Sequence, residues 1–213
     1  MENTEFLNQK NKKVTKLLSA LGLYTYDSYL KQFQEWVEQG KTSSKDASKE
    51  LIEFTKLNFA RTQRIHKTIV IYPLLKKSVE SLQNNYMWMV ITEAWCGDSA
   101  QSLPVIAEIA KLNTEKIKLY IIFRDPNPDL MNNYLTSGAR AIPKLIVINE
   151  TSGEEVFVWG PRPAPAQELL KAWKINPEGK TWGDFEKELH GWYAKDKAVT
   201  LQSEFLSIIN ELD

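Results

Sequence analysis

Cys96 is the only cysteine of the 213-residue chain, and it lies in the segment 92–101, which has the sequence TEAWCGDSAQ. Ser99 follows three residues later, at the position where a second thiol would complete a Cys-x-x-Cys pair. An apolar run precedes Cys96 and a helical pattern follows it, so we expect Cys96 at a helix N-terminus. Unpaired backbone N–H groups and the helix dipole favour a thiolate there, which predicts a pKa lowered from about 8.5 toward neutrality.

The alternative for Cys96 is a purely structural role, because free cysteines are often small hydrophobic components of a core. A single cysteine forms no internal disulfide, so thiol chemistry would require a second molecule. A reducing compartment fits this composition. The polar N-terminal segment lacks the apolar region of a signal peptide, and no apolar run is long enough to span a bilayer. We therefore expect a cytoplasmic protein that does not act at a membrane.

The charges of the chain are balanced, with 27 basic and 27 acidic residues. This balance gives no reason to expect nucleic acid as a partner. His66 and His190 are far apart in sequence and have no carboxylate or cysteine at metal-ligand spacing. We expect no metal and no cofactor, and we interpret the basic residues around Arg61 and Arg64 as a solvated helix end.

Apolar residues at helical spacing predict helices over residues 14–21, 26–37 and 44–66. Short apolar runs then predict strands at 68–71, 87–94, 117–123, 144–148 and 155–159, with helices at 73–82, 97–112 and 129–136 between them and another beginning near 161. Further apolar stripes predict two helices after Pro177.

Strands that are joined by crossover helices run parallel, whereas the short turn at Ser152-Gly153 predicts an antiparallel hairpin. The fold class is therefore α/β, with a mixed sheet and helices on both faces. We expect an N-terminal helical extension at 1–66, the α/β domain at 67–175, and a C-terminal helical extension at 176–213 packed on the same domain.

The segment Trp95–Ser99 resembles the Trp-Cys-Gly-Pro-Cys active site of the thioredoxin superfamily, which lies at the same strand-to-helix junction. Pro104, eight residues after Cys96, matches the proline that kinks the following helix in thioredoxins. Arg140–Pro143 and the strand after it resemble the stretch that carries a cis-proline opposite the nucleophile. The resemblance covers about residues 67–175, and the whole chain resembles an uncharacterised bacterial thioredoxin-like family with added terminal helices.

The resemblance implies a cis Ile142–Pro143 bond, which would expose the backbone of Ile142 so that an extended substrate segment can pair with it beside Cys96. An ordinary trans proline at the start of a strand is the alternative. Trp95 either borders the substrate groove, as the resemblance implies, or packs in the core. We interpret Arg162, in the segment Gly160–Pro163, as a solvated loop residue, with carboxylate binding as its alternative.

The chain departs from the thioredoxin pattern at three positions. Ser99 cannot resolve a mixed disulfide, although its hydroxyl can donate a hydrogen bond to the Cys96 sulfur and support a thiolate. Asp98 follows Gly97 where thioredoxins have proline; its charge opposes a thiolate unless it serves as a helix cap. Val90 replaces the buried acid of thioredoxins, which leaves water, Glu93 or the partner as the proton donor for a leaving thiol.

These features predict a monothiol protein of cell redox homeostasis. Cys96 would exchange with a protein or low-molecular-weight disulfide, Ser99 would support it, and an external thiol reductant would regenerate it. The binding residues would be Trp95, Gly97, Asp98, Ile142 and Pro143. The alternative is a non-catalytic binding module or redox sensor on the same fold. A glutathione transferase is excluded by the helices that come first, and a peroxiredoxin by the absence of its Pro-x-x-x-Thr-x-x-Cys pattern.

Overall fold

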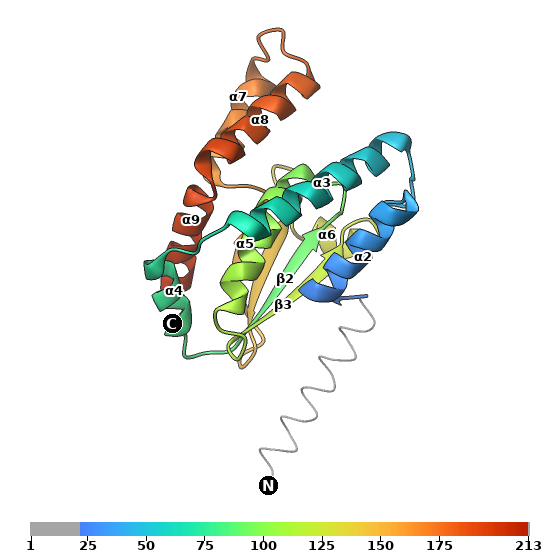
Figure 1. Ribbon diagram of the computed structural model, residues 1–213. Coiled ribbons are helices and arrows are strands. Elements are labelled where there is room, and N and C mark those ends of the chain that lie inside the picture. Colours follow the sequence, from blue (N-terminus) through green and yellow to red (C-terminus); the bar gives the residue numbers. More distant parts are fainter. Residues whose placement is uncertain (1–21, 213) are drawn as a thin grey trace.

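The computed structural model describes residues 22–212, and a five-stranded sheet lies at its centre (Figure 1). The strand order is β1-β3-β2-β4-β5. The strands are β1 (Tyr24–Thr25), β2 (Tyr86–Thr92), β3 (Ile117–Phe123), β4 (Lys144–Asn149) and β5 (Glu155–Trp159). The predicted helix over residues 14–21 lies outside the described residues.

The strand pairing confirms the predicted α/β class and mixed sheet. Strand β2 runs parallel to β3 and antiparallel to β4, so that Trp88 lies between Leu119 and Val147. Strands β4 and β5 form the predicted antiparallel hairpin. Strand β1 was not predicted, and it pairs antiparallel with β3 at the sheet edge.

Helices precede, connect and follow the strands. In chain order they are α2 (Tyr26–Gln39), α3 (Lys49–Thr68), α4 (Pro73–Glu80), α5 (Gly97–Lys111), α6 (Pro128–Asn132), α7 (Ala164–Ile175), α8 (Trp182–Asp196) and α9 (Val199–Asn210). Local signals set several of their first residues: the Ser48 side chain accepts the Leu51 N–H at the start of α3, and Thr181 with Asp184 forms a capping box at the start of α8. Across residues 22–212, no helix has both the length and the apolar character that crossing a bilayer requires.

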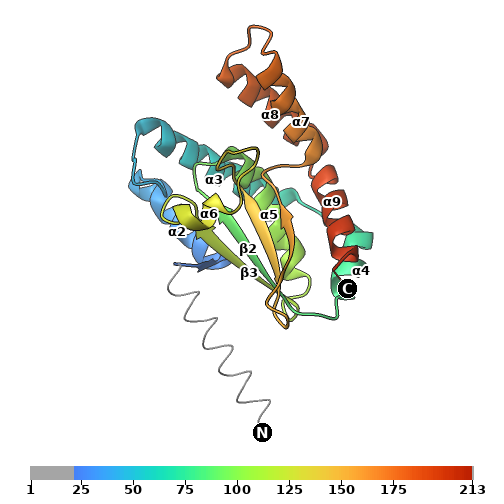
Figure 2. The same cartoon turned by 180° about the vertical axis from the view of Figure 1, so that it is seen from behind.

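The two faces of β2 contribute to two different clusters, because successive side chains of a strand point to opposite faces. Trp88 and Val90 belong to the main core, which α2, α4, α5 and α9 cover. Met89 and Ile91 belong to a smaller cluster that also contains Cys96. Figure 2 shows the short helix α6 on the side of the sheet that bears this smaller cluster.

The predicted strand at residues 68–71 is wrong. Helix α3 continues through Thr68, and residues 69–72 form an extended connection to α4 without joining the sheet. Two of their backbone groups bond to one side chain from α9: Gln202 Oε1 accepts the Tyr72 N–H at 2.8 Å, and Gln202 Nε2 donates to Val70 O at 3.3 Å. The apolar run at 68–71 does not form a strand, because it does not pair with the sheet and its backbone hydrogen bonds with α9 replace those of a strand.

Helices α7 and α8 pack side by side and project from the sheet as a helical hairpin (Figures 1 and 2). They share a separate hydrophobic cluster that includes Leu170, Phe185 and Leu189. The last turns of α8 return to the body of the molecule beside the first turn of α5, where Cys96 is located.

Candidate functional site

Cys96 is the N-cap residue of α5, as the sequence predicts. Its carbonyl accepts the Ala100 N–H at 3.1 Å, and its own N–H donates to Glu93 O at 3.1 Å. Pro104 lies inside α5, also as predicted. The end of β2 and the start of α5 therefore fix the position of the thiol through backbone hydrogen bonds.

The Ile142–Pro143 bond is cis, which confirms that prediction. Ile142 O lies 3.4 Å from Cys96 Sγ and accepts a hydrogen bond from the thiol. A second cis bond, Gly160–Pro161, was not predicted. Gly160 has a φ of 112°, and a Cβ at this position would lie 2.2 Å from Pro143 O, so only glycine allows the two loops to approach. The structure thus brings Cys96, Ile142 and Pro143 together.

The expected lowering of the Cys96 pKa is wrong. Cys96 is only 8% exposed, and burial raises the pKa of the thiol to about 11, with a further increase from the negative charge of Asp98. Hydrogen bonds from Ser99 and the positive charge of Arg162 lower this pKa, but they do not outweigh burial. The desolvation of the charged form is therefore larger than the stabilisation at the helix N-terminus.

Ser99 is buried and lies one helical turn from the N-cap residue. Its hydroxyl accepts a hydrogen bond from Thr92 Oγ1 at 2.7 Å, which leaves its own proton for the Cys96 sulfur. This arrangement provides the support for a thiolate that the sequence predicts at Ser99.

Asp98 forms a buried ion pair with Arg162, so the interpretation of Arg162 as a solvated loop residue is wrong. The guanidinium donates to Asp98 Oδ2 through Nε at 3.1 Å and again through its Nη2 group. Tyr193 of α8 donates to Asp98 Oδ1 at 2.8 Å. Asp98 lies in the first turn of α5, where its negative charge complements the helix dipole, and its two oxygens join α5 to α8 and to the loop after β5.

Trp95 and its neighbours attach the Cys96 loop to surrounding elements. The Arg124 guanidinium lies 4.8 Å from the centre of the Trp95 ring and covers it. The buried Asn58 side chain of α3 donates to Trp95 O at 2.7 Å and accepts from Arg61 at 2.8 Å. Trp95 therefore combines packing with a position on the floor of the cleft described below.

Gly97 allows close contact between α5 and α8. A Cβ at Gly97 would lie 2.8 Å from both Cε1 and Nε2 of His190, which only glycine avoids. His190 Nδ1 is hydrogen-bonded to Gln101 Nε2 at 3.2 Å. Burial lowers the pKa of His190 to about 4, so the ring is neutral near pH 7.

Glu93 is fully buried three residues before Cys96. Its carboxylate accepts hydrogen bonds from the Ser43 hydroxyl and from the Asp125 N–H, the latter at 2.8 Å. Burial raises the pKa of Glu93 to about 7, so in a large fraction of the molecules the Glu93 carboxyl group is protonated at neutral pH.

A cleft of about 850 Å³ opens over Cys96. Helix α3 forms one wall with Leu51, Phe54 and Leu57, and α8 forms the other with Trp182 and other residues. The floor is formed by 95–98 and 140–142. Of the residues predicted from sequence, five line this partly apolar cleft, namely Trp95, Cys96, Gly97, Asp98 and Ile142, whereas Ser99 and Pro143 do not. The cleft is large enough for a peptide side chain or a small thiol.

Several residues of this site were not predicted: Asn58, Arg61, Tyr193 and His190 come from the helices before and after the central elements. Asn58 carried a signal, since it is a polar residue on the apolar side of a predicted helix. Nothing local distinguishes Tyr193 or His190 from other residues of an amphipathic helix. Nowhere in the described part of the chain do three or more His, Cys, Asp or Glu side chains gather as metal ligands.

The pKa of Cys96 predicts slow alkylation at neutral pH. We expect the rate with iodoacetamide to rise roughly tenfold per pH unit from pH 7 to about pH 10, because only the thiolate reacts. The reaction is followed by intact mass, with the urea-unfolded protein as the control, whose rate should level off above about pH 8.5. A native rate that levels off near neutral pH would contradict the effect of burial.

Comparison with known proteins places the chain in a family. Residues 44–174 match a family model described as Thioredoxin. No curated protein matches the chain. Two similar solved structures are a protein of unknown function from Pseudomonas aeruginosa and an HIV epitope scaffold. The first is 18% identical, covers 89% of this chain and 99% of its own, and has a TM-score of 0.56. The second is 19% identical, covers 89% of this chain and 100% of its own, and has a TM-score of 0.52. At these sequence identities, the similarity to the two solved structures concerns the fold alone.

Proposed function

Because this chain belongs to the thioredoxin family, we propose that it carries out monothiol thiol–disulfide exchange through Cys96. The observation that carries the proposal is the position of the sulfur, at the N-terminus of α5, 3.4 Å from Ile142 O and at the base of the cleft. The proposed division of the chain assigns the chemistry to residues 67–175. The flanking segments 1–66 and 176–213 supply the walls of the cleft through α3 and α8.

The proposed reaction has two steps. The Cys96 thiolate attacks one sulfur of a partner disulfide, a Cys96–partner disulfide forms, the partner S–S bond breaks, and the second partner sulfur leaves as a thiolate that takes up the proton released by Cys96. An external low-molecular-weight thiol then attacks the partner sulfur of the mixed disulfide. Cys96 is released as a thiolate and is reprotonated, and the partner leaves as a mixed disulfide with the external thiol.

The partner would bind as an extended segment beside Ile142. A backbone N–H of that segment would replace the Cys96 thiol as the donor to Ile142 O and free the sulfur for attack. Ser99 and Arg162 would stabilise the thiolate as it forms, since both lower the pKa of Cys96. Trp95 would border the bound segment. The partners we propose are protein or low-molecular-weight disulfides in the cytoplasm, where external thiols are abundant.

The raised pKa of Cys96 favours a second candidate, a binding module in which the cleft holds a polypeptide without chemistry. The two candidates differ in what happens to a disulfide. Exchange changes the covalent state of the partner and requires the sulfur, whereas binding alone does not.

Exposure to oxidised glutathione tests the proposal. We expect intact mass to show one glutathione adduct at Cys96, and we expect a reduced external thiol to clear it faster than it clears the same adduct on a peptide with the sequence of residues 92–101. The folded site would accelerate this step by positioning and by stabilising the leaving Cys96 thiolate through Ser99. Equal clearance rates for protein and peptide would contradict an enzymatic role and favour the binding module.

A further inference from the structure

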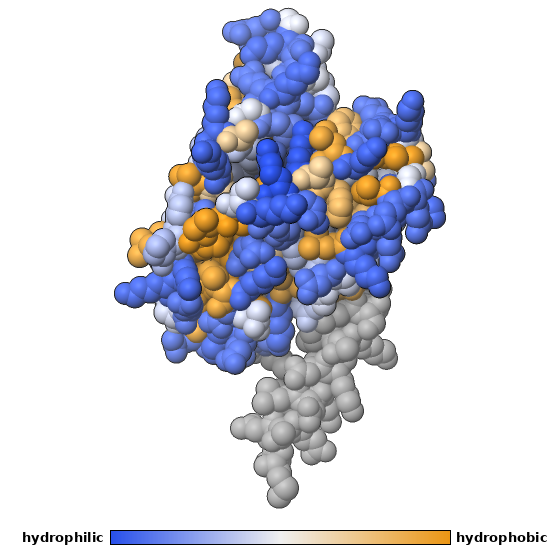
Figure 3. Space-filling view, viewed as in Figure 1, coloured by the Kyte–Doolittle hydropathy of each residue, from blue (hydrophilic) through white to orange (hydrophobic). Residues whose placement is uncertain are grey.

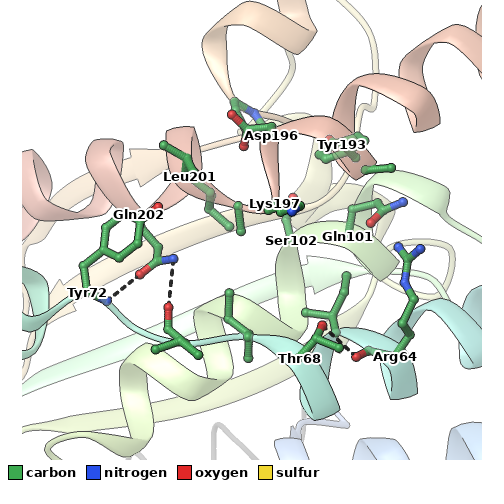
Figure 4. Close-up of a pocket in the computed structure, with 17 residues that line it drawn as sticks. Arg64, Thr68, Tyr72, Gln101, Ser102, Tyr193, Asp196, Lys197, Leu201 and Gln202 are labelled. Atoms are coloured by element: carbon green, nitrogen blue, oxygen red, sulfur yellow. Dashed lines mark hydrogen bonds between the residues drawn. The ribbon is translucent and has the colours of Figure 1, made fainter.

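A second pocket, of about 600 Å³, lies apart from the Cys96 cleft, between α3, α5 and the junction of α8 with α9 (Figure 4). Ile69, Val70 and Tyr72 form one side of it, and Leu201 of α9 forms part of the other. Two exposed hydrophobic side chains, Val70 and Val199, line it, and hydrophobic side chains gather on the surface near the end of α3 and α9 (Figure 3).

The lining of this pocket is mainly aliphatic. Its larger aliphatic side chains are Ile65, Ile69, Val70, Val199 and Leu201, and Pro163, Ala194, Ala198 and the rings of Tyr72 and Tyr193 complete the apolar lining. Val70 is 75% exposed, although it lies in the middle of this apolar surface. A pocket with this lining and volume matches the size and character of sites that bind small apolar molecules.

Two basic side chains at this pocket have no acidic partner within residues 22–212. Arg64 comes from the last part of α3 and Lys197 from the α8–α9 junction, and neither forms an ion pair or a side-chain hydrogen bond with any described residue. The one carboxylate in the lining, Asp196, already accepts hydrogen bonds from the backbone and hydroxyl of Thr200. Arg64 and Lys197 outnumber Asp196 in the lining, so the pocket presents a net positive charge beside an aliphatic surface.

One buried polar atom also faces this region. The hydroxyl of Ser102, a residue of α5 with no solvent exposure, approaches the Tyr193 phenol but forms no regular hydrogen bond. Buried hydroxyls normally have a partner, and Ser102 lines the pocket. A ligand atom that accepts a hydrogen bond would satisfy it. By contrast, both the amide oxygen and the amide nitrogen of the nearby Gln202 have partners, in the backbone of Tyr72 and Val70.

We propose that this pocket binds an amphiphile with one carboxylate and an aliphatic body. The aliphatic part would lie against Ile69, Val70 and Leu201, where it leaves water. The carboxylate would lie near Arg64 and Lys197, which can form charge-assisted hydrogen bonds with it. The site is independent of the thiol, because neither Cys96 nor Ile142 lines it.

Titration with decanoate tests this proposal in the ¹⁵N-labelled full chain, below the micelle concentration. We expect saturable amide shifts confined to residues 64–72, 101–102 and 193–202. Decanol, which has the same chain length without the charge, should bind more weakly. Arg64→Gln/Lys197→Gln should weaken decanoate binding roughly tenfold, the effect of a lost charge-assisted contact. The matched control is Lys174→Gln, an exposed lysine on α7 outside the pocket.

A second variant tests the apolar wall. Val70→Asp places a carboxylate in the proposed binding surface at a position that is already 75% exposed, so the fold should be retained and decanoate binding should be lost. Ile175→Asp is the control, because Ile175 is 85% exposed and lies outside the pocket. The proposal is wrong if no shift appears in these segments, if decanol binds as tightly as decanoate, or if shifts centre on the Cys96 cleft.

Discussion

Cys96→Ser is expected to abolish thiol–disulfide exchange, with the rate falling to that of the buffer thiol alone. A hydroxyl has nearly the size of a thiol but is not a redox nucleophile, and no other cysteine exists in the chain to take over. The effect is the largest that we predict. It is measured with a glutathionylated peptide as substrate and reduced glutathione as the second thiol.

Two controls separate chemistry from folding and binding. Ser99→Ala should retain exchange but with a higher Cys96 pKa, because the Ser99 hydrogen bonds lower it, and its rate at pH 8 should therefore be below wild type. A disulfide-free peptide should bind Cys96→Ser and wild type equally, since the cleft walls are unchanged. Exchange that persists in Cys96→Ser would refute the proposed function, while intact binding without any wild-type exchange would favour the binding module.

Asp98→Asn should lower the free energy of unfolding by about 3 kcal/mol, because it leaves the buried Arg162 charge without its partner. The side chains of the pair are only 9% and 10% exposed, so solvent cannot replace the lost interaction. Urea unfolding measures the change. The same variant should show a Cys96 pKa below that of wild type, because the charge of Asp98 raises it, and the pH dependence of alkylation reports this second effect.

A surface pair provides the matched control for this variant. Glu168 and Lys171 form an ion pair on α7 with side chains that are 66% and 53% exposed, and Glu168→Gln should change stability by less than about 0.5 kcal/mol. Asp98→Asn/Arg162→Met removes both buried charges and should recover part of the lost stability. An unchanged urea midpoint in Asp98→Asn would show that the pair does not hold α5 against the loop after β5.

The raised pKa of the single thiol would make exchange depend on binding of the partner. At neutral pH the free protein would hold Cys96 mainly as a thiol bonded to Ile142 O. A partner that takes over this acceptor would remove that bond, so attack would be coupled to binding of the partner. Non-specific reaction with abundant disulfides would be slow for the same reason.

Local sequence patterns determined most of the fold. The apolar runs at β2, β3, β4 and β5 and the helical spacing of the flanking segments predicted the α/β class, the mixed sheet and the final hairpin, because period and turn chemistry are local properties. The position of Cys96 at the start of α5 followed from the local apolar and helical patterns, and the cis bond before Pro143 followed from the resemblance of short segments to thioredoxins.

Only the tertiary structure decided what residues distant in sequence do to one another. Residues 68–71 have the apolar character of a strand, yet Gln202, some 130 positions later, forms hydrogen bonds with Val70 O and the adjacent Tyr72 N–H. The Cys96 pKa rises although the helix N-terminus favours a thiolate, because packing removes the sulfur from water. Arg162 is buried in an ion pair with Asp98, which lies 64 positions earlier. Desolvation and pairing depend on which surfaces meet, and a local pattern does not contain that information.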